Sequence, residues 1–156
     1  MKAGEISFTK GSVREMKSVL EDMAGDHIAE ASSFYGTFRY EPNIYMYEQL
    51  DGLGSLQIYL AKVGKKVVGY SVYFLSRHHQ FHSTLHGLND ILYVKPSARG
   101  FWVLEFIKWC EFELVQLGAD VIWAQHANKK DLSILFKRLG YSLGDMRYYK
   151  IIPKGA

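Results

Sequence analysis

The sequence predicts a single α+β domain over residues 1–156, with a mixed, mostly antiparallel sheet flanked by helices. Two consecutive runs, 56–60 and 67–75, alternate apolar residues around Gly64 and Lys65, which is typical of a β-hairpin. Later in the chain, short apolar runs alternate with stretches of helical spacing, which favours strands covered by helices. The 156 residues are 48% hydrophobic and 22% charged, which suits one compact domain with a buried core.

The N-terminal part predicts one strand and two helices. Residues 6–8 alternate as in a short strand. Ser12 followed by Glu15 has the spacing of a capping box, which predicts the start of a long helix. A second short helix is expected after Pro42, within a segment rich in Phe and Tyr over 31–47.

The C-terminal part predicts further strands and helices, which complete the order β-α-α-β-β-β-α-β-α-β. A continuous apolar stripe at helical spacing marks the longest of these helices, and Gly118 ends it. The predicted elements are a strand ending over 90–94, a helix from near Arg99 to Leu117, a strand over 120–124, a helix over 130–139 and a strand over 147–152.

Composition limits the classes of function. The only cysteine, Cys110, excludes an internal disulfide and a cysteine-based zinc site. A net charge of +3 suits an anionic ligand but argues against a dedicated nucleic-acid binder. No apolar run approaches the ~20 residues of a membrane span, and the N-terminus lacks the apolar stretch of a signal peptide. We therefore expect a cytoplasmic protein with no membrane partner.

The turn over 95–100 lies between a buried strand and a helix, which predicts an anion site. Free backbone N–H groups and the positive end of the helix dipole attract phosphate. Gly100 would let a ligand approach the backbone closely, and Arg99 adds a positive charge. The alternative is a simple connection with Arg99 in solvent.

Two blocks of sequence around this turn resemble the GNAT superfamily of acyltransferases. Leu92-Tyr93-Val94-x-Pro96-x-x-Arg99-Gly100, followed by a helix and the strand at 118–121, resembles its coenzyme A-binding motif. The stretch from Asn128 to Tyr141 resembles its closing motif of an Asn, a helix and then Gly-Phe. Both blocks stand in the family's order and spacing. The compact build and the 90–94 strand are most similar to the small acyltransferase-like proteins of tailed bacteriophages.

The resemblance implies an N-acetyltransferase that transfers an acetyl group from acetyl-CoA to an amine by direct attack on the thioester. The strand backbone would lie beside the pantetheine arm and stabilise the oxyanion, and the amides of the turn would hold the pyrophosphate. The acceptor would be a small molecule or a protein, and the enzyme would work in the cytoplasm, or in the host cytoplasm if phage-encoded. The implied cofactor-binding residues are Leu92, Tyr93, Val94, Arg99, Gly100, Phe101, Trp102, Val103, Leu104 and Asn128.

Asp90 and His86 are the candidate catalytic residues. In a regular strand, alternation places both on one face together with Leu88, Leu92 and Val94. A carboxylate among apolar neighbours has a raised pKa, which suits a general base, and His86 would relay the proton. Alternatively, Asp90 caps a loop or pairs with a cation.

Three positions depart from the family's pattern. Trp102 and Leu104 stand where small residues let the backbone approach phosphate, and Phe136 stands where a tyrosine acts as general acid. The residues that could replace this acid are Tyr141, Tyr148 and Tyr149. The departures favour a second hypothesis, a non-catalytic interaction protein such as a phage factor that binds a host protein. A third is an RNA- or tRNA-directed acyltransferase.

Other residue clusters leave two interpretations open. The loop histidines His78, His82 and His86 have i, i+4 spacing, but Gly87 and the flanking strands argue against a helical zinc site, so no metal is predicted. The aromatic residues over 34–47 would either form an acceptor pocket that stacks on a cationic amine or simply cover the sheet.

His27 and His126 are isolated, and we assign them structural roles. Family members often dimerise through C-terminal strands, and 148–152 is a candidate edge for a homodimer.

Overall fold

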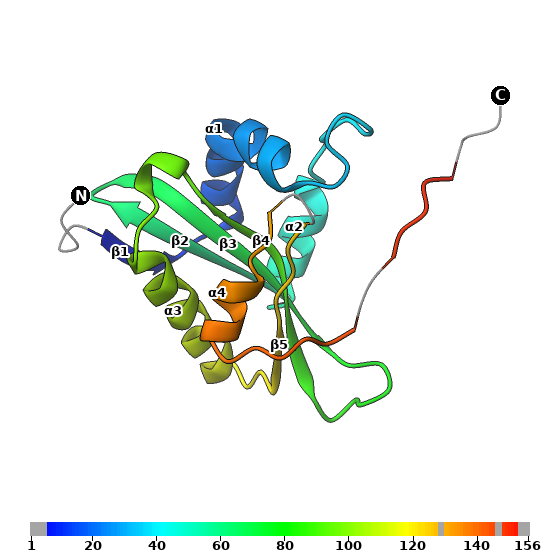
Figure 1. The fold of residues 1–156 in the computed structure, drawn as a ribbon. Helices are drawn as coiled ribbons and strands as arrows, with labels where there is room; N and C mark the ends of the chain where they lie inside the picture. The colour runs from blue at the N-terminus through cyan, green and yellow to red at the C-terminus, as the bar shows by residue number, and fades with distance from the viewer. Residues whose placement is uncertain (1–5, 128–129, 146–147, 153–156) are drawn as a thin grey trace.

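The computed structural model describes residues 6–127, 130–145 and 148–152. These residues form a five-stranded sheet in the order β1-β2-β3-β4-β5, with helices on both faces (Figure 1). The strands are β1 (Ile6–Lys10), β2 (Leu56–Val63), β3 (Lys66–Arg77), β4 (Leu85–Val94) and β5 (Val121–Trp123). The helices are α1 (Val13–Ala31), α2 (Ile44–Gly52), α3 (Trp102–Gln116) and α4 (Ser133–Arg138), with a 3₁₀ turn, η2, over Pro96–Ala98. The predicted fold class is confirmed.

The sheet consists of an antiparallel meander with one parallel strand added. β1 to β4 pair with their sequence neighbours in antiparallel register. β5 pairs in parallel with β4, and only from His86–Val121 to Leu88–Trp123. Beyond Leu88, the edge of β4 on this side therefore has no strand partner among the described residues.

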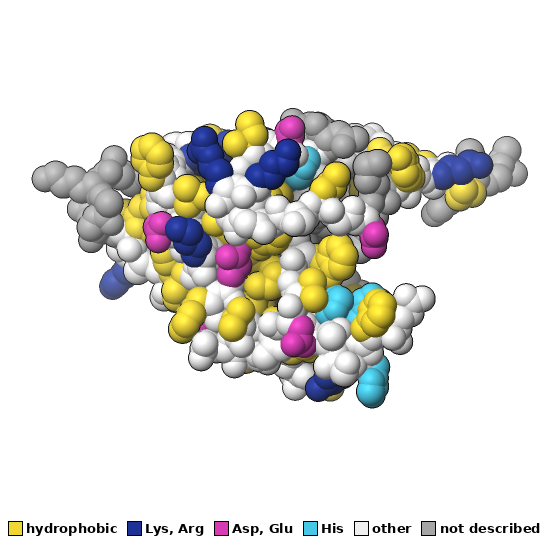
Figure 2. Space-filling model, turned by 60° about the horizontal axis from the view of Figure 1, so that its bottom comes forward, with side chains coloured by type: hydrophobic (Ala, Val, Ile, Leu, Met, Phe, Trp, Pro, Cys, Tyr) yellow, Lys and Arg dark blue, Asp and Glu magenta, His cyan; other side chains and the backbone are white. Residues whose placement is uncertain are grey.

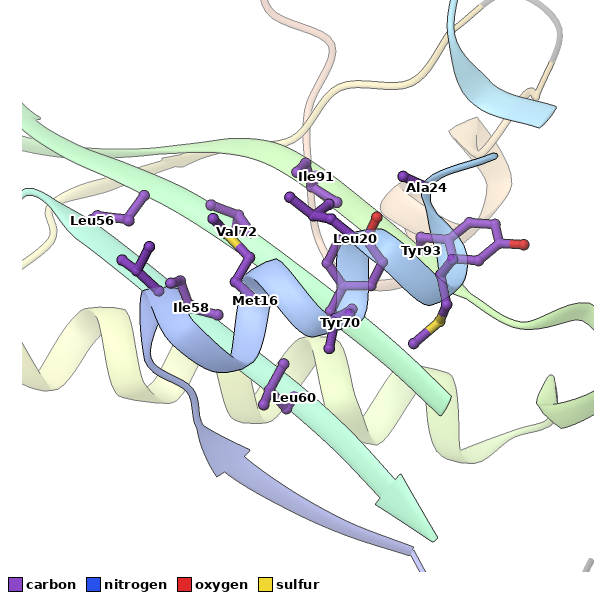
Figure 3. Close-up of a cluster of buried hydrophobic side chains, with 13 residues drawn as sticks. Met16, Leu20, Ala24, Leu56, Ile58, Leu60, Tyr70, Val72, Ile91 and Tyr93 are labelled. Carbon is purple, nitrogen blue, oxygen red and sulfur yellow. The ribbon is translucent and has the colours of Figure 1, made fainter. Parts of the chain in front are cut away.

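Helix α1 covers one face of the sheet and begins at the predicted capping box. The Ser12 side chain accepts a hydrogen bond from the Glu15 amide, and the Glu15 carboxylate accepts one from the Ser12 amide. The apolar stripe of α1 is buried against the sheet, as Met16 and Leu20 beside Val72 show in Figure 3. Removing this apolar area from water is the main contribution of the stripe to stability.

Helix α3 covers the opposite face. Its buried side chains Phe106, Cys110 and Leu114 pack against Tyr59 and Tyr73 of the sheet. The predicted apolar stripe of this helix is thus buried at Ile107, Cys110 and Leu114, whereas Leu117, which the prediction included, follows the end of the helix and is exposed. Helix α2 packs on the α1 face, so α1 and α2 lie together on one side of the sheet.

The predicted last strand is wrong for the residues that the structure describes. Residues 148–152 form no strand, and Arg147 lies outside the described residues. This segment runs away from the sheet (Figure 1), and Tyr148 is 88% exposed. Strand pairing needs a neighbouring edge, and a pattern in the sequence cannot supply one.

Two predicted helices begin later than expected. Helix α3 begins at Trp102, because the residues after Pro96 first form the 3₁₀ turn. Helix α4 begins at Ser133, whose backbone N–H donates to the Asp131 carboxylate. None of the helices in the described part of the chain is long and apolar enough to cross a membrane.

Candidate functional site

A cleft of about 800 Å³ opens where β4 and β5 separate. One wall is β4 over 89–94, and the other is the stretch around 125–127 that follows β5. The C-terminal end of α1 and the aromatic residues after it complete the cleft. Figure 2 shows a face of the molecule on which exposed hydrophobic side chains surround a recess, with charged side chains among them.

A β-bulge shapes the β4 wall. Ile91 pairs with Val72 and Asn89 pairs with Tyr73, so Asp90 is an extra residue with no partner on β3. The buried Asn89 side chain stabilises the bulge, because its Nδ2 donates to Ile91 O at 2.9 Å and to Val72 O at 3.3 Å. The backbone carbonyls that the bulge displaces thus still have hydrogen-bond donors.

The bulge corrects the prediction that five residues of β4 share one face. Leu92 and Val94 pack in the core under α3, whereas Ile91 and Tyr93 pack in the core under α1. The extra residue at 90 reverses the alternation of side chains along the strand. Asp90 lines the cleft near Tyr40 and therefore lies on the α1 and α2 side, away from Leu92 and Val94.

The Asp90 carboxyl has the electrostatics of a proton acceptor. It is open to solvent inside the cleft, yet the surrounding walls desolvate it and raise its pKa. Desolvation, followed by the charge of Asp90, raises the pKa of Tyr47 to about 12 and also raises the pKa of Tyr40. The two tyrosines therefore stay neutral and present an aromatic surface beside the carboxylate.

His86 lies at the start of β4 and is not among the residues that line the cleft with Asp90. Its Nδ1 accepts a hydrogen bond from the Trp123 indole at 2.9 Å. Its Nε2 lies 3.0 Å from the Thr84 hydroxyl, which itself donates to Phe81 O, so Nε2 carries the proton. Both ring nitrogens are engaged, and the catalytic role of His86 stays a prediction.

Of the loop histidines, His78 lies in the predicted loop. His78 shapes the loop before β4, since its Nδ1 accepts from the amides of Gln80 and Phe81. Within the described residues, no three His, Cys, Asp or Glu side chains gather as metal ligands. His27 and His126, to which the sequence assigns only structural roles, both line the cleft.

His27 forms part of the cleft floor. Its Nδ1 lies 2.8 Å from the Tyr70 hydroxyl, and its ring stacks on Tyr93 at a centroid distance of 4.9 Å. Burial lowers the pKa of His27 to about 4, so the ring is neutral at physiological pH. No motif indicates this residue, because its partners come from β3 and β4, more than forty residues away.

The predicted anion turn lies at one end of the cleft. Val103 N–H donates to Gly100 O and Leu104 N–H donates to Phe101 O, so these two amides are occupied. Among the described residues, no backbone carbonyl accepts from the N–H groups of Gly100, Phe101 or Trp102. These three amides are therefore the candidate donors to an anion in the turn.

The Trp102 side chain packs against this turn, because a Cβ added at Gly100 would lie 3.3 Å from its indole. Its ring lies 6.3 Å from that of Phe8, and its Nε1 donates to Ala98 O at 2.8 Å. Leu104 is half-buried, and Val103 lines the cleft. Trp102 therefore covers part of the turn at Ala98 and Gly100, and Asn128 lies outside the described residues.

Arg99 joins the anion turn to the cleft. Its Nε donates to Val94 O at 3.0 Å, and its guanidinium lies 5.8 Å from the centre of the Tyr93 ring. Its terminal NH2 group lies 2.7 Å from both carboxylate oxygens of Glu30. Lys130 Nζ lies 2.6 Å from the same carboxylate. No motif indicates Glu30 or Lys130, because these two residues and Arg99 come from separate segments of the chain.

The closing helix holds no tyrosine at the predicted acid position, and Phe136 is buried there. Of the three suggested replacements, Tyr141 is directed to α3, where its hydroxyl donates to Glu111 at 2.7 Å. Tyr148 and Tyr149 line the cleft, and the Tyr149 ring lies 5.1 Å from that of Phe34.

Comparisons of sequence find no family model and no curated protein that matches the chain. Comparison of structures gives many matches. An aminoglycoside acetyltransferase, meta-AAC0020 from an uncultured soil metagenomic sample, is similar with a TM-score of 0.74 over 98% of this chain and 100% of its own, at 11% identity. The chain has the GNAT fold.

Other structures with the GNAT fold support the same assignment. Glucosamine-6-phosphate N-acetyltransferase from Arabidopsis thaliana gives a TM-score of 0.70 at 10% identity, over 95% of this chain and 99% of its own. A predicted acetyltransferase with acetyl-CoA from Clostridium acetobutylicum gives a TM-score of 0.69 at 12% identity. The match covers 94% of this chain and 96% of the other. Identities this low establish the fold, and the activity has to be argued from the residues of the cleft.

Proposed function

We propose that the chain is an N-acetyltransferase that transfers an acetyl group from acetyl-CoA to an amine. The observation that carries the proposal is the edge of β4 that has no strand partner in the described part of the chain. This edge lines the cleft, with Asp90 near one end and the Arg99 turn near the other. The similar structures include acetyltransferases, and one of them is described with acetyl-CoA.

The free edge of β4 fits an extended amide-bearing chain such as pantetheine. Lys95 N–H donates to Val68 O on β3, so the alternation of an antiparallel strand directs the N–H groups of Leu92 and Val94 into the cleft. Val94 O also points that way, since Arg99 Nε donates to it. The Leu92 and Val94 amides are thus the candidate donors to a thioester carbonyl, and the turn amides with Arg99 would hold the phosphates.

The chemistry requires one proton acceptor and correct positioning. The substrate that receives the acetyl group is an ammonium ion in water. Asp90 takes one proton from this ion to give the free amine. The nitrogen then attacks the carbonyl carbon, a C–N bond forms, and the C–S bond breaks to release the thiolate of coenzyme A. The nitrogen carries an extra proton after the attack, and it releases this proton to water or to the thiolate, which leaves the neutral amide. Where the hydroxyl of Tyr149, which lines the cleft, protonates the thiolate instead, Tyr149 regains a proton from water.

The walls around Asp90 fit a cationic acceptor. Tyr40 and Tyr47 lie close enough for the charge of Asp90 to affect their pKa values, and Phe34 lines the same cleft. Aromatic faces and a carboxylate both stabilise an ammonium ion. The acceptor class that follows is a small amine, or the amino group of a protein side chain or terminus.

The first test is the binding of acetyl-CoA by isothermal titration calorimetry. Binding at micromolar to millimolar cofactor supports the proposal, and no heat of binding at millimolar acetyl-CoA would refute it. That result would favour the non-catalytic interaction protein, for which the buried Phe136 is the supporting observation. The narrower resemblance to phage proteins and the RNA-directed activity stay predictions.

The second test separates the base from the binding site. In Asp90→Asn, turnover should fall by roughly 10²-fold or more with acetyl-CoA affinity unchanged. Because the pKa of Asp90 is raised, wild-type activity should decline on the acid side at a pH above the ordinary range of an aspartate, and the variant should lack this decline. Asp51→Asn, an exposed position on α2, is the matched control. An equal rate and pH profile in Asp90→Asn would exclude Asp90 as the base.

A further inference from the structure

The carboxylate of Glu30 occupies the place where the cations of the cleft meet. Arg99 contacts both of its oxygens at 2.7 Å, and Lys130 contacts one of them at 2.6 Å. The three residues come from the last turn of α1, the turn before α3 and the segment before α4, so one ion-pair cluster links three elements across the cleft. All three also line the cleft.

Helix α1 by itself gives no reason for a carboxylate at position 30. The C-terminal end of a helix carries a partial negative charge, which disfavours an acidic side chain there. The last turn of α1 contains no basic residue that would offset this. Partial burial would raise the pKa of Glu30, yet the hydrogen bonds from Arg99 and Lys130 outweigh it and lower the pKa. The stability of the Glu30 charge therefore depends on two cations from elsewhere in the chain.

Arg99 does not depend on Glu30 in the same way. Its Nε is held by Val94 O, and its guanidinium lies over the Tyr93 ring. The guanidinium would therefore keep its place if the Glu30 carboxylate moved away. With Glu30 in contact, the cluster has one net positive charge, from two cations and one anion. Without it, two cations would face the cleft.

We infer that Glu30 is an internal competitor that occupies an anion site formed by Arg99 and Lys130, and that a phosphate-bearing ligand enters this site by displacing it. The inference deepens the proposed function, because the pyrophosphate of coenzyme A would be such a ligand, and for that ligand it rests on the proposed function. It adds Lys130 as an anion-binding residue. The contacts to be broken are partly exposed, with side-chain exposures of 34% for Arg99 and 25% for Glu30, so phosphate can replace them at modest cost.

The test compares Glu30→Gln with the wild-type protein in calorimetric titrations with inorganic pyrophosphate. Removing the competing charge should tighten pyrophosphate binding by roughly three- to tenfold. Glu21→Gln, at an exposed position of the same helix, changes the net charge equally and should leave the affinity unchanged. Lys130→Ala should weaken pyrophosphate binding. Equal or weaker binding by Glu30→Gln would overturn the inference, since Glu30 would then position the cations.

Two further ligands separate this inference from the proposed function. Coenzyme A should bind Glu30→Gln more tightly than the wild-type protein, whereas pantetheine, which lacks the phosphates, should bind both equally. The inference would also be overturned if Glu30→Gln increased the affinity for pantetheine as much as the affinity for coenzyme A. Such a result would show that Glu30 only narrows the cleft. If no form of the protein binds coenzyme A, the proposed function fails, and the pyrophosphate titrations still decide the role of Glu30.

Discussion

The β4 bulge depends on one buried amide, and this gives the sharpest test of the structure. Asn89 is 3% exposed, and its Nδ2 lies within 3.3 Å of Val72 O, Ile91 O and Ser71 Oγ. Replacing Asn89 by Ala removes these donors. Ile91 O keeps the Ser71 hydroxyl as a donor at 2.9 Å, whereas Val72 O loses the Asn89 amide. A buried polar atom left without a partner costs about 1–3 kcal/mol, so Asn89→Ala should lower the free energy of unfolding by about 1–3 kcal/mol.

Thermal and urea unfolding measure this loss. For a chain of this size, a loss of 1 kcal/mol lowers the melting temperature by about 2–4 °C, so the thermal midpoint should fall by about 2–12 °C. Ser71→Ala removes one hydroxyl and should cost about 1 kcal/mol. Gln57→Ala is the matched control, because its amide also donates to a backbone carbonyl, Gly54 O, but at the surface. If Asn89→Ala lost no more stability than Gln57→Ala, the amide would not support the bulge.

Three other predictions concern titrating groups and tyrosines. The pKa of Asp90 is raised in the folded state, so the charged carboxylate destabilises the fold above that pKa. Asp90→Asn should therefore raise the melting temperature at pH 7, and this increase should vanish in acid. Burial lowers the pKa of His27 to about 4, so the free energy of unfolding of the wild-type protein should fall by about 2–3 kcal/mol as pH drops from 6.5 towards 4. In urea unfolding, the stability of His27→Gln should depend less on pH. Tyr141→Phe should lose about 1 kcal/mol by removing the donor to Glu111 and should keep wild-type turnover, whereas a large fall in turnover would make Tyr141 part of the acid machinery.

Local features of the fold were predictable from sequence because they depend on residues close together in the chain. The capping box at Ser12 and Glu15 lies within one helical turn, and the turn between β2 and β3 is only two residues long. The stripe of α3 needs only a period of 3.6 residues. Each of these patterns has few alternative structures, so the sequence alone distinguishes them.

The site was less predictable because it depends on distant partners. At the bulge, the Asn89 amide donates to the hydroxyl of Ser71, 18 residues earlier, and the Glu30–Arg99 contact joins residues 69 apart. Alternation along β4 predicted the wrong face for Asp90 relative to Leu92, since an extra residue in a strand leaves no mark in a pattern of period two. The turn at Arg99 was predicted because the strand, the turn and the helix are consecutive.

The short pairing between β4 and β5 divides the cleft into two regions of unequal stability. β1 to β4 form a contiguous antiparallel meander with helices on both sides, whereas β5 is held to β4 by three residue pairs. Regions with few buried contacts open locally at lower free energy than the core, so the amides of β5 and α4 should exchange with deuterium before those of β3. We therefore expect the β4 wall of the cleft to exchange slowly and the wall that follows β5 to exchange sooner. A ligand that spans both walls would slow exchange mainly in the second.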